Sequence, residues 1–259
     1  MIGFAATGLT GTLGLSIENK LLSVDRSIMS DQKALSELFS SYKIRNILHL
    51  ASPTKTFEKG GTNQEYRYGI FETTMNLFDV FVNAGGIKFG YVSSAHVYGE
   101  KGGESTLKES DKCKPISDYA KWKLETEVEL EARAKRNGIQ VLVMRPFSIF
   151  GNGMRAHFLA GRLETESKSG RFSPISYALD YRDFSTPREV TTRMIRVMES
   201  QSEDIFITLN ICSGVAQTVK DKVLSYYSDF PEEKFNLKVS QLPYLVGDPT
   251  KLQKFLKDT

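Results

Sequence analysis

The first fourteen residues constrain the fold of this chain more than any other stretch. A short apolar run at 2–6 predicts a buried strand, and a loop with glycines at positions 8, 11 and 14 follows it. Glycine lacks a Cβ and tolerates φ > 0, so backbone N–H groups of such a loop can approach a phosphate. A short helical segment after the loop would direct its positive dipole end at the same anion. This order is typical of a dinucleotide-binding fingerprint, although a purely structural glycine turn is the alternative for these residues alone.

The length of 259 residues suits one large α/β domain, or a nucleotide-binding domain with a small second lobe. Two cysteines far apart, Cys113 and Cys212, argue against a disulfide framework and for a reducing compartment. No apolar run is long enough to span a bilayer, and the chain starts with a predicted strand rather than a signal peptide. We therefore expect a cytoplasmic protein with no membrane partner. The net charge of +3 without a Lys/Arg block argues against nucleic acid as a partner, and no His/Cys spacing predicts a metal site.

Predicted helices and strands alternate regularly over the first 150 residues. This alternation predicts a parallel, doubly wound sheet of the Rossmann type. Beyond Gly151 the alternation weakens, and we expect residues 151–259 to form a small substrate-binding lobe interleaved with the NAD(P)-binding domain at 1–150. The predicted strands are 2–6, 21–24, 47–50, 88–93, 140–145 and 205–211, and the predicted helices are 31–42, 66–83, 118–137, 188–200, 218–227 and 252–256.

Four candidate residues, Gly8, Asp25, Ala51 and Ser94, fall just past predicted strand ends. Ligands of parallel sheets bind at the carboxyl ends of the strands, so these residues should converge on one edge. Asp25 follows Gly8 by 25 − 8 = 17 positions, near the roughly 20 expected for the acid that binds the adenosine ribose. Its carboxylate would repel a 2′-phosphate, whereas Arg26 could pair with one, and a solvated charge pair is the structural alternative. We expect NAD as cofactor, with NADP left open.

Tyr119 and Lys123 are four residues apart in a predicted helix and therefore share a face. An ammonium beside a phenol stabilises the phenolate and lowers the pKa of the tyrosine, which would make it a general acid/base near neutral pH. Taken alone, a Tyr/Lys pair at this spacing is more often a solvated helix face. The catalytic interpretation of this pair therefore depends on the other motifs of the chain.

These motifs, in this order, resemble the extended short-chain dehydrogenase/reductases that act on nucleotide sugars, the NAD-dependent epimerase/dehydratase family. The resemblance runs from residue 1 to about 215. Several ordered motifs are more specific than any single one, and together they favour the functional interpretation. The motifs are the glycine loop at 7–14, His49-Leu50-Ala51, the stretch 93–99, Tyr119 to Lys123, the stretch 145–151 and Arg182-Asp183-Phe184.

The resemblance implies an oxidoreductase that works at C4 of a nucleotide sugar, its partner molecule. Tyr119 would move the proton on the C4 oxygen, Ser94 would orient that oxygen, and Lys123 would hold the nicotinamide ribose. The implied substrate-binding residues are Ser94, His96, Ser148 and Arg182. The implied cofactor-binding residues are Gly8, Thr10, Gly11, Thr12, Leu13, Gly14, Asp25, Arg26, Leu50, Ala51, Ser52, Tyr119, Lys123, Pro146 and Phe147.

Departures from the family pattern narrow the expected activity. The dehydratases carry Asp-Glu directly after the active-site hydroxyl, whereas Ala95 and His96 stand here, which argues against 4,6-dehydration. His96 could contact substrate or only hydrogen-bond within its loop, and Arg182 could bind a diphosphate or only pair with Asp183. The short chain favours a 4-ketosugar reductase; a 4-epimerase and a non-catalytic cofactor-binding regulatory protein are the alternatives.

Two further expectations come from the resemblance. Dimerisation through the two long helices at 66–83 and 118–137 is common in the family, so we expect a homodimer. The stretch 246–251 is similar to a C-terminal stretch of the GDP-mannose dehydratase and GDP-deoxyhexulose reductase branch. A helix cap at Asp248 or Thr250 is the structural alternative for that stretch.

Overall fold

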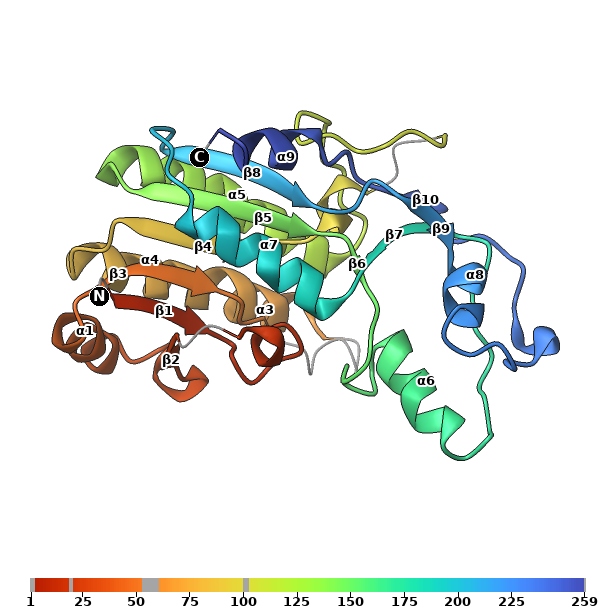
Figure 1. Ribbon diagram of the computed structural model, residues 1–259. Coiled ribbons are helices and arrows are strands. Elements are labelled where there is room, and N and C mark those ends of the chain that lie inside the picture. The colour runs from red at the N-terminus through yellow and green to blue at the C-terminus, as the bar shows by residue number, and fades with distance from the viewer. Residues whose placement is uncertain (1–2, 19–20, 53–60, 100–102, 259) are drawn as a thin grey trace.

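A six-stranded parallel sheet forms the centre of the protein, a computed structural model that describes residues 3–18, 21–52, 61–99 and 103–258 (Figure 1). The strand order is β2-β1-β3-β4-β5-β8, and every neighbouring pair is parallel. This confirms the predicted doubly wound α/β fold. The strands are β1 (Gly3–Thr7), β2 (Leu22–Val24), β3 (Ile44–His49), β4 (Lys88–Val92), β5 (Gln140–Pro146) and β8 (Phe206–Ile211).

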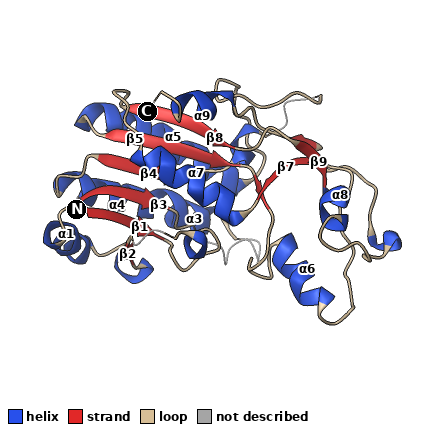
Figure 2. Cartoon of the chain, in the orientation of Figure 1, coloured by secondary structure: helices blue, strands red, loops and turns tan. Residues whose placement is uncertain are grey.

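Helices cover both faces of this sheet, but unequally (Figure 2). We call the face that packs against α1 (Gln32–Ser41), α4 (Thr73–Asn83) and α5 (Asp118–Asn137) the back face. The other, front face packs against α7 (Pro187–Glu199) and α9 (Thr250–Phe255). Successive side chains of a strand point to opposite faces of a sheet, so the central strands are buried on both sides. In β5, Val141 and Val143 pack on the back face, and Leu142 and Met144 pack on the front face.

The predicted helix 66–83 begins earlier and contains a wider turn. A capping box formed by Thr62 and Glu65 starts α3 (Asn63–Tyr66), which continues through a π-helical stretch, η3 (Arg67–Glu72), into α4. Single π-turns inside helices are frequent at functional sites. This one packs against α5, where Phe71 contacts Trp122, three residues after the candidate tyrosine.

The helix expected after the glycine loop is only a single 3₁₀ turn, η1 (Gly14–Ser16). The prediction of a dipole directed at a phosphate is therefore wrong, because a macrodipole needs several turns of aligned peptide units. The sheet beside β1 also has fewer strands than is usual for a dinucleotide-binding fold. A dinucleotide-binding sheet usually has two strands on this side of its first strand, whereas within the described residues only β2 stands beside β1 there.

A small second sheet extends beyond the end of β5 (Figure 1). It has its own hydrophobic cluster, built around Phe150, Leu163 and Phe230. The sequence patterns did not predict this sheet or α6. The chain passes between the two sheets more than once, because α7 and β8 return to the main sheet. The division at residue 150 into cofactor-binding and substrate-binding regions stays a prediction. The elements are β6 (Ser148–Ile149), α6 (Leu159–Ser167), β7 (Tyr181–Ser185), β9 (Ala216–Thr218), α8 (Val219–Leu224) and β10 (Tyr244–Leu245).

The described residues lack a membrane-spanning helix and a cluster of metal ligands. None of the helices there combines the length and the apolar character needed to cross a membrane. No group of three or more His, Cys, Asp or Glu side chains in the same residues could hold a metal ion.

Candidate active site

The candidate residues meet at the carboxyl edge of the sheet, as the strand register requires. Thr7 at the end of β1 pairs with Val24 and with His49, and His49 pairs with Tyr91 near the end of β4. The loops after these strands therefore leave the sheet side by side. Ser94 lies two residues after the end of β4 and caps the 3₁₀ turn η4 (Ala95–Tyr98). Its hydroxyl accepts a hydrogen bond from the His96 N–H at 3.2 Å, and the residue is 7% exposed.

Tyr119 lies in the first turn of α5, which begins where Ser117 caps the backbone N–H of Ala120. Burial raises the pKa of Tyr119 to about 12, because it penalises the charged phenolate. The hydroxyls of Ser94 and Ser52 oppose this rise, so both lie beside the phenol. The structure thus brings together three hydroxyls that are far apart in the sequence.

Lys123 lies one turn further along α5 and is only 2% exposed. Its Nζ donates a hydrogen bond to the Val92 carbonyl at 2.8 Å and lies 5.8 Å from the centre of the Tyr119 ring. Burial lowers the pKa of Lys123 to about 7, and the Glu127 carboxylate partly opposes that change. The expectation that Lys123 lowers the pKa of Tyr119 is wrong in this structure. Burial dominates both pKa values, and Lys123 is not among the groups that shift Tyr119.

The glycine loop contacts the loop after β3 closely. Gly8 has a φ of +72°, and a Cβ there would lie 2.8 Å from the Ala51 nitrogen. A Cβ on Gly14 would lie 2.3 Å from the Leu9 Cα, so neither position accepts a larger residue without backbone movement. Both glycines are therefore needed for backbone packing, and this alone does not assign them to a phosphate.

A buried histidine joins the two loops to the helical layer. His49 Nδ1 lies 2.7 Å from Thr7 Oγ1, and His49 Nε2 lies 3.0 Å from Thr74 Oγ1. Thr7 Oγ1 also accepts a hydrogen bond from the Ala51 N–H, and the Thr74 hydroxyl donates to the Ile70 carbonyl. These bonds assign the proton of the ring to Nε2. Burial, together with the charge of Lys123, lowers the pKa of His49 to about 3, so the ring is neutral.

Asp25 ends β2 on the same edge as Gly8, but its carboxylate already has a local role. It accepts hydrogen bonds from the Ser27 N–H at 2.8 Å and the Ser27 hydroxyl at 2.7 Å, which starts the 3₁₀ turn η2 (Arg26–Ile28). The Ser27 backbone bond contributes most to lowering the pKa of Asp25. Asp25 and Arg26 are both exposed. Their roles towards the ribose stay predictions.

The substrate candidates His96 and Arg182 lie near each other, but their partners differ from those expected. Desolvation, and then the positive charge of Arg182, lowers the pKa of His96. Arg182 pairs with Asp180 at 2.8 Å and not with its neighbour Asp183. Asp183 instead accepts hydrogen bonds from the backbone N–H groups of residues 213 and 214. The structural alternative for Arg182, a salt bridge, therefore forms with Asp180 and not with Asp183, and the expected diphosphate contact stays a prediction.

The remaining predicted residues fall into three groups. Pro146 ends β5, Phe147 follows it in a small buried cluster, and Ser148 begins β6. Leu13 and Leu50 pack, partly buried, against the front face. The loop residues beside them were expected to contact the cofactor through their backbone and hydroxyls: Thr10, Gly11, Thr12 and Ser52.

The donor set at this edge fits a bound dinucleotide. The side-chain oxygens of Thr12 and Ser93 are buried, and no described residue is placed to form a hydrogen bond with them. Buried hydroxyls without partners are uncommon in folded proteins, and a ligand at this edge would give them partners.

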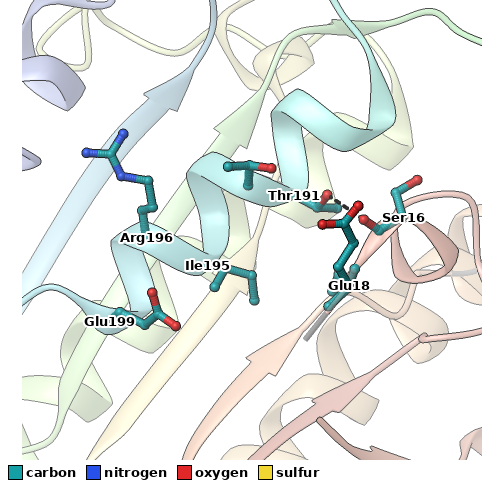
Figure 3. A pocket seen from close by; sticks show the side chains of 8 residues that line it. Ser16, Glu18, Thr191, Ile195, Arg196 and Glu199 are labelled. Atoms are coloured by element: carbon teal, nitrogen blue, oxygen red, sulfur yellow. Dashed lines mark hydrogen bonds between the residues drawn. The ribbon is translucent and has the colours of Figure 1, made fainter. Parts of the chain in front are cut away.

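The sequence patterns did not point to Arg155, which also belongs to this region. Its Nη2 donates to the Thr10 carbonyl of the glycine loop at 3.0 Å, although the two residues are 145 positions apart. A hollow of about 230 Å³ lies between the residues around η1 and α7, and none of the candidate residues lines it (Figure 3). Ser16, Glu18 and Thr191 are among the residues that line it.

A family model, the NAD dependent epimerase/dehydratase family, matches residues 9–212. The chain belongs to this family. Membership confirms the resemblance that the sequence motifs suggested and places the chain among NAD-dependent enzymes that include epimerases and dehydratases.

Three known proteins show how far the similarity extends. A UDP-glucose 4-epimerase from Vibrio cholerae is 34% identical over 90 residues, which are 33% of this chain and 26% of that protein. A GDP-6-deoxy-D-talose 4-dehydrogenase from Aggregatibacter actinomycetemcomitans is 24% identical over 192 residues, or 71% of this chain and 64% of that protein. The chain thus matches less than two thirds of the length of either relative.

Among solved structures, the UDP-glucuronic acid 4-epimerase from Bacillus cereus in complex with UDP-glucuronic acid and NAD superimposes with a TM-score of 0.82. The match covers 99% of this chain and 93% of that one, at 20% identity. At this identity the likeness establishes the fold alone.

Proposed function

We propose that the protein is an NAD(P)-dependent oxidoreductase acting at C4 of a nucleotide sugar, in the direction of a 4-ketosugar reductase. The observation that carries this proposal is the cluster of Ser94, Tyr119 and Lys123, in which burial further disfavours the phenolate of Tyr119. A protonated phenol in a cluster of hydroxyls is suited to donate a proton to a carbonyl oxygen.

Each residue of the cluster has a distinct role in the proposal. Tyr119 donates its proton to the C4 oxygen as the carbonyl becomes an alcohol, and Ser94 holds that oxygen through its hydroxyl. Lys123 is held towards the same edge by its bond to the Val92 carbonyl and binds the nicotinamide ribose. A bound nicotinamide cofactor supplies the hydride for this step.

The glycine loop, with Ala51 and Ser52 beside it, holds the cofactor in this proposal. The His49 network supports the arrangement, because one chain of hydrogen bonds joins the ends of β1 and β3. His96 and Arg182 lie on the substrate side. Their predicted contacts with the nucleotide sugar stay part of the proposal, and Arg182 would have to bind a diphosphate while it is paired with Asp180.

A 4-epimerase is the second candidate, since it needs the same proton transfer in both directions. All three similar proteins have the sugar position 4 in their names, two as epimerases and one as a dehydrogenase. A 4,6-dehydratase is disfavoured because Ala95 and His96 stand where that reaction needs an acidic pair. A regulatory protein without catalysis is a further alternative, but members that lack Tyr or Lys would fit it better.

The deciding experiment has two arms. In the first, purified protein is mixed with NADH or NADPH and a panel of UDP-, GDP- and dTDP-4-ketosugars, and cofactor oxidation is followed by absorbance, with Tyr119→Phe as control. In the second, the protein is denatured and the released nucleotides are identified by mass spectrometry. Stoichiometric oxidation without retained cofactor supports the reductase. Retained NAD with interconversion of two C4 epimers and no net oxidation supports the epimerase, and inactivity of every pair supports the regulatory protein.

A further inference from the structure

Lys123 holds its ammonium group where burial disfavours a charge. The side chain is 2% exposed, and burial lowers the pKa of Lys123 to about 7. The Glu127 carboxylate, one turn further along α5, opposes this change, but it is itself paired with Arg145, whose Nε donates to Glu127 Oε1 at 3.1 Å. With a pKa this close to neutrality, any further interaction that favours the ammonium decides how much of it is charged.

The ring of Tyr91 provides such an interaction. Lys123 Nζ lies over this ring, 4.8 Å from its centre, and its bond to the Val92 carbonyl at 2.8 Å holds it there. The last two residues of β4 therefore both contact the ammonium. A cation over an aromatic face within about 6 Å is attracted by the ring quadrupole, most strongly where water is excluded. Tyr91 is fully buried, so the contact meets that condition.

The other groups around the ammonium differ from Tyr91 in charge or in distance. Burial raises the pKa of Tyr91 well above its ordinary value, so the ring acts as a neutral aromatic face. His49 is neutral as well, and the Tyr119 ring lies further away, at 5.8 Å. The titratable groups that the packed elements bring to this region are Tyr119 and Glu127 on α5, Tyr91 on β4, His49 on β3, Arg145 on β5 and, behind Tyr119, Tyr66 on α3.

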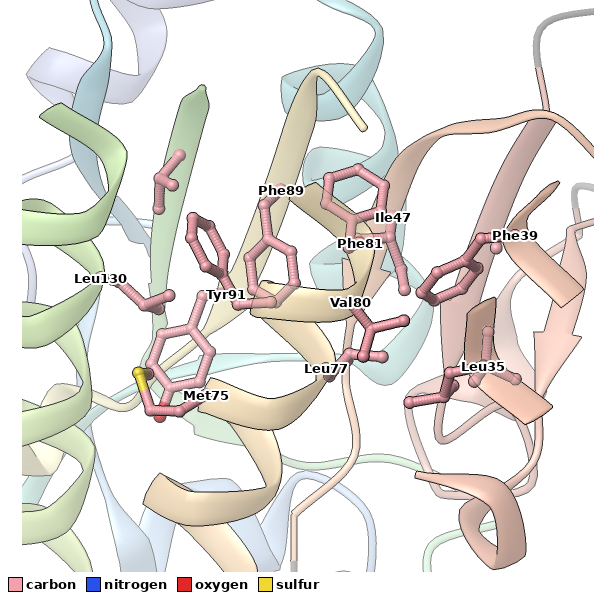
Figure 4. Packing of buried hydrophobic residues seen from close by; sticks show 14 of the residues in the cluster. Leu35, Phe39, Ile47, Met75, Leu77, Val80, Phe81, Phe89, Tyr91 and Leu130 are labelled. Carbon is pink, nitrogen blue, oxygen red and sulfur yellow. The ribbon is translucent and has the colours of Figure 1, made fainter. Parts of the chain in front are cut away.

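We propose that Tyr91 is a positioning residue, whose ring stabilises the charged form of Lys123 and directs it at the nicotinamide ribose. The inference rests on the proposed function, in which Lys123 binds that ribose. Tyr91 would itself contact neither cofactor nor substrate, because it lies wholly within the cluster on the back face (Figure 4). Its effect on cofactor binding would come through the charge of Lys123.

The direct test is the pKa of Lys123, measured by NMR titration of the intact protein with isotope-labelled lysine and assigned by loss of the signal in Lys123→Met. Tyr91→Phe keeps the ring and Tyr91→Leu removes it. Phe89→Leu is the matched control, because Phe89 is equally buried on the same face of β4, and its ring contacts Phe78 and Phe81. We expect Tyr91→Leu to lower the pKa of Lys123 by about one unit or more, and the other two to leave it within about 0.3.

A second series keeps the size of the ring and weakens only its attraction for a cation. Fluorinated phenylalanines incorporated at position 91 withdraw negative charge from the ring face stepwise, so the pKa of Lys123 should fall with each added fluorine. A role of Tyr91 in packing alone would give no such trend. Absence of the trend, or an equal fall of the pKa in Phe89→Leu and Tyr91→Leu, would overturn the inference.

Cofactor binding separates the inference from the proposed function. Calorimetric titration with NADH should show a steeper loss of affinity with rising pH in Tyr91→Leu than in the unaltered protein or Phe89→Leu, because more of Lys123 is then neutral. The same pH dependence in all three proteins would overturn the link to the ribose. A lowered Lys123 pKa in Tyr91→Leu, with no binding of NADH or NADPH by the unaltered protein, would support the Tyr91 contact and overturn the proposed function.

Discussion

The two faces of the central sheet differ in how thickly they are covered. On the back face, α1, α4 and α5 bury large side chains such as Phe39, Phe78 and Phe81, all fully inaccessible (Figure 4). On the front face, α7 supplies most of the buried helical residues, and the region after β1 contributes only partly buried ones such as Leu13 and Ile17.

The proposed proton-transfer residues and the proposed cofactor-binding loop therefore lie on differently packed sides of the sheet. Tyr119 and Lys123 lie on α5, a 20-residue helix of the back layer, and their positions depend on its packing. The glycine loop leads into a three-residue turn on the front face. We therefore expect the proton-transfer groups to be rigidly placed and the adenosine side of the cofactor to be more weakly held.

The largest expected effect is on turnover. Tyr119→Phe keeps the packing of the ring and removes the proton donor, so turnover should fall by about 10²–10⁴-fold, the usual contribution of general acid/base catalysis. NADH affinity should change little, because the back layer stays intact. Steady-state kinetics and a separate binding titration measure the two effects. Ser94→Ala should cost less, since it leaves the donor in place, and near-normal turnover in Tyr119→Phe would contradict the catalytic role.

The two layers can also be compared by their stability. Phe81→Ala removes a fully buried ring that contacts Phe39 and Phe89, and it should cost about 3–5 kcal/mol of unfolding free energy. Leu13→Ala removes a partly buried side chain on the front face and should cost less than about 2 kcal/mol. Urea unfolding of both variants provides the measurement. Equal losses would show that the front layer is as tightly packed as the back.

The free energy of unfolding should fall at acid pH, because His49 is buried in its neutral form. The folded pKa is about 3 and the ordinary value is 6.5, so the unfolded chain binds more protons between these limits. The stability from the neutral ring is complete above pH 6.5 and is lost as the pH falls towards 3. At pH 5 this group alone should cost about 2 kcal/mol. Unfolding of His49→Gln, followed over the same range, should lack this part of the slope; an identical slope would refute the assignment.

Local patterns predicted the main sheet and α5 well, because strands and helices that bury one face show it in their own sequence. The short η1 was less visible, although the spacing of 17 between Gly8 and Asp25 already left little room for a helix before β2. The partner of Arg182 was missed for a geometric reason. In an extended strand, residues two apart share a face, so Arg182 meets Asp180 and Asp183 points the other way. Arg155 could not be predicted at all, since its contact depends on how two distant loops pack.

The smallest expected effect concerns the choice between NAD and NADP. It tests the proposed adenosine side of the cofactor site most directly. Asp25 is exposed, and its carboxylate is bonded to Ser27, so it can repel a 2′-phosphate only through a solvated and screened charge. Exposed charges interact weakly, and we therefore expect NADH to bind only a few-fold more tightly than NADPH. Asp25→Ala should remove this preference, and Arg26→Ala should increase it. Titration of both cofactors against both variants measures the ratio. A preference for NADH of a hundredfold or more would show that the adenosine side is held as firmly as the catalytic side, and NADPH binding more tightly than NADH would reverse the assignment of Asp25.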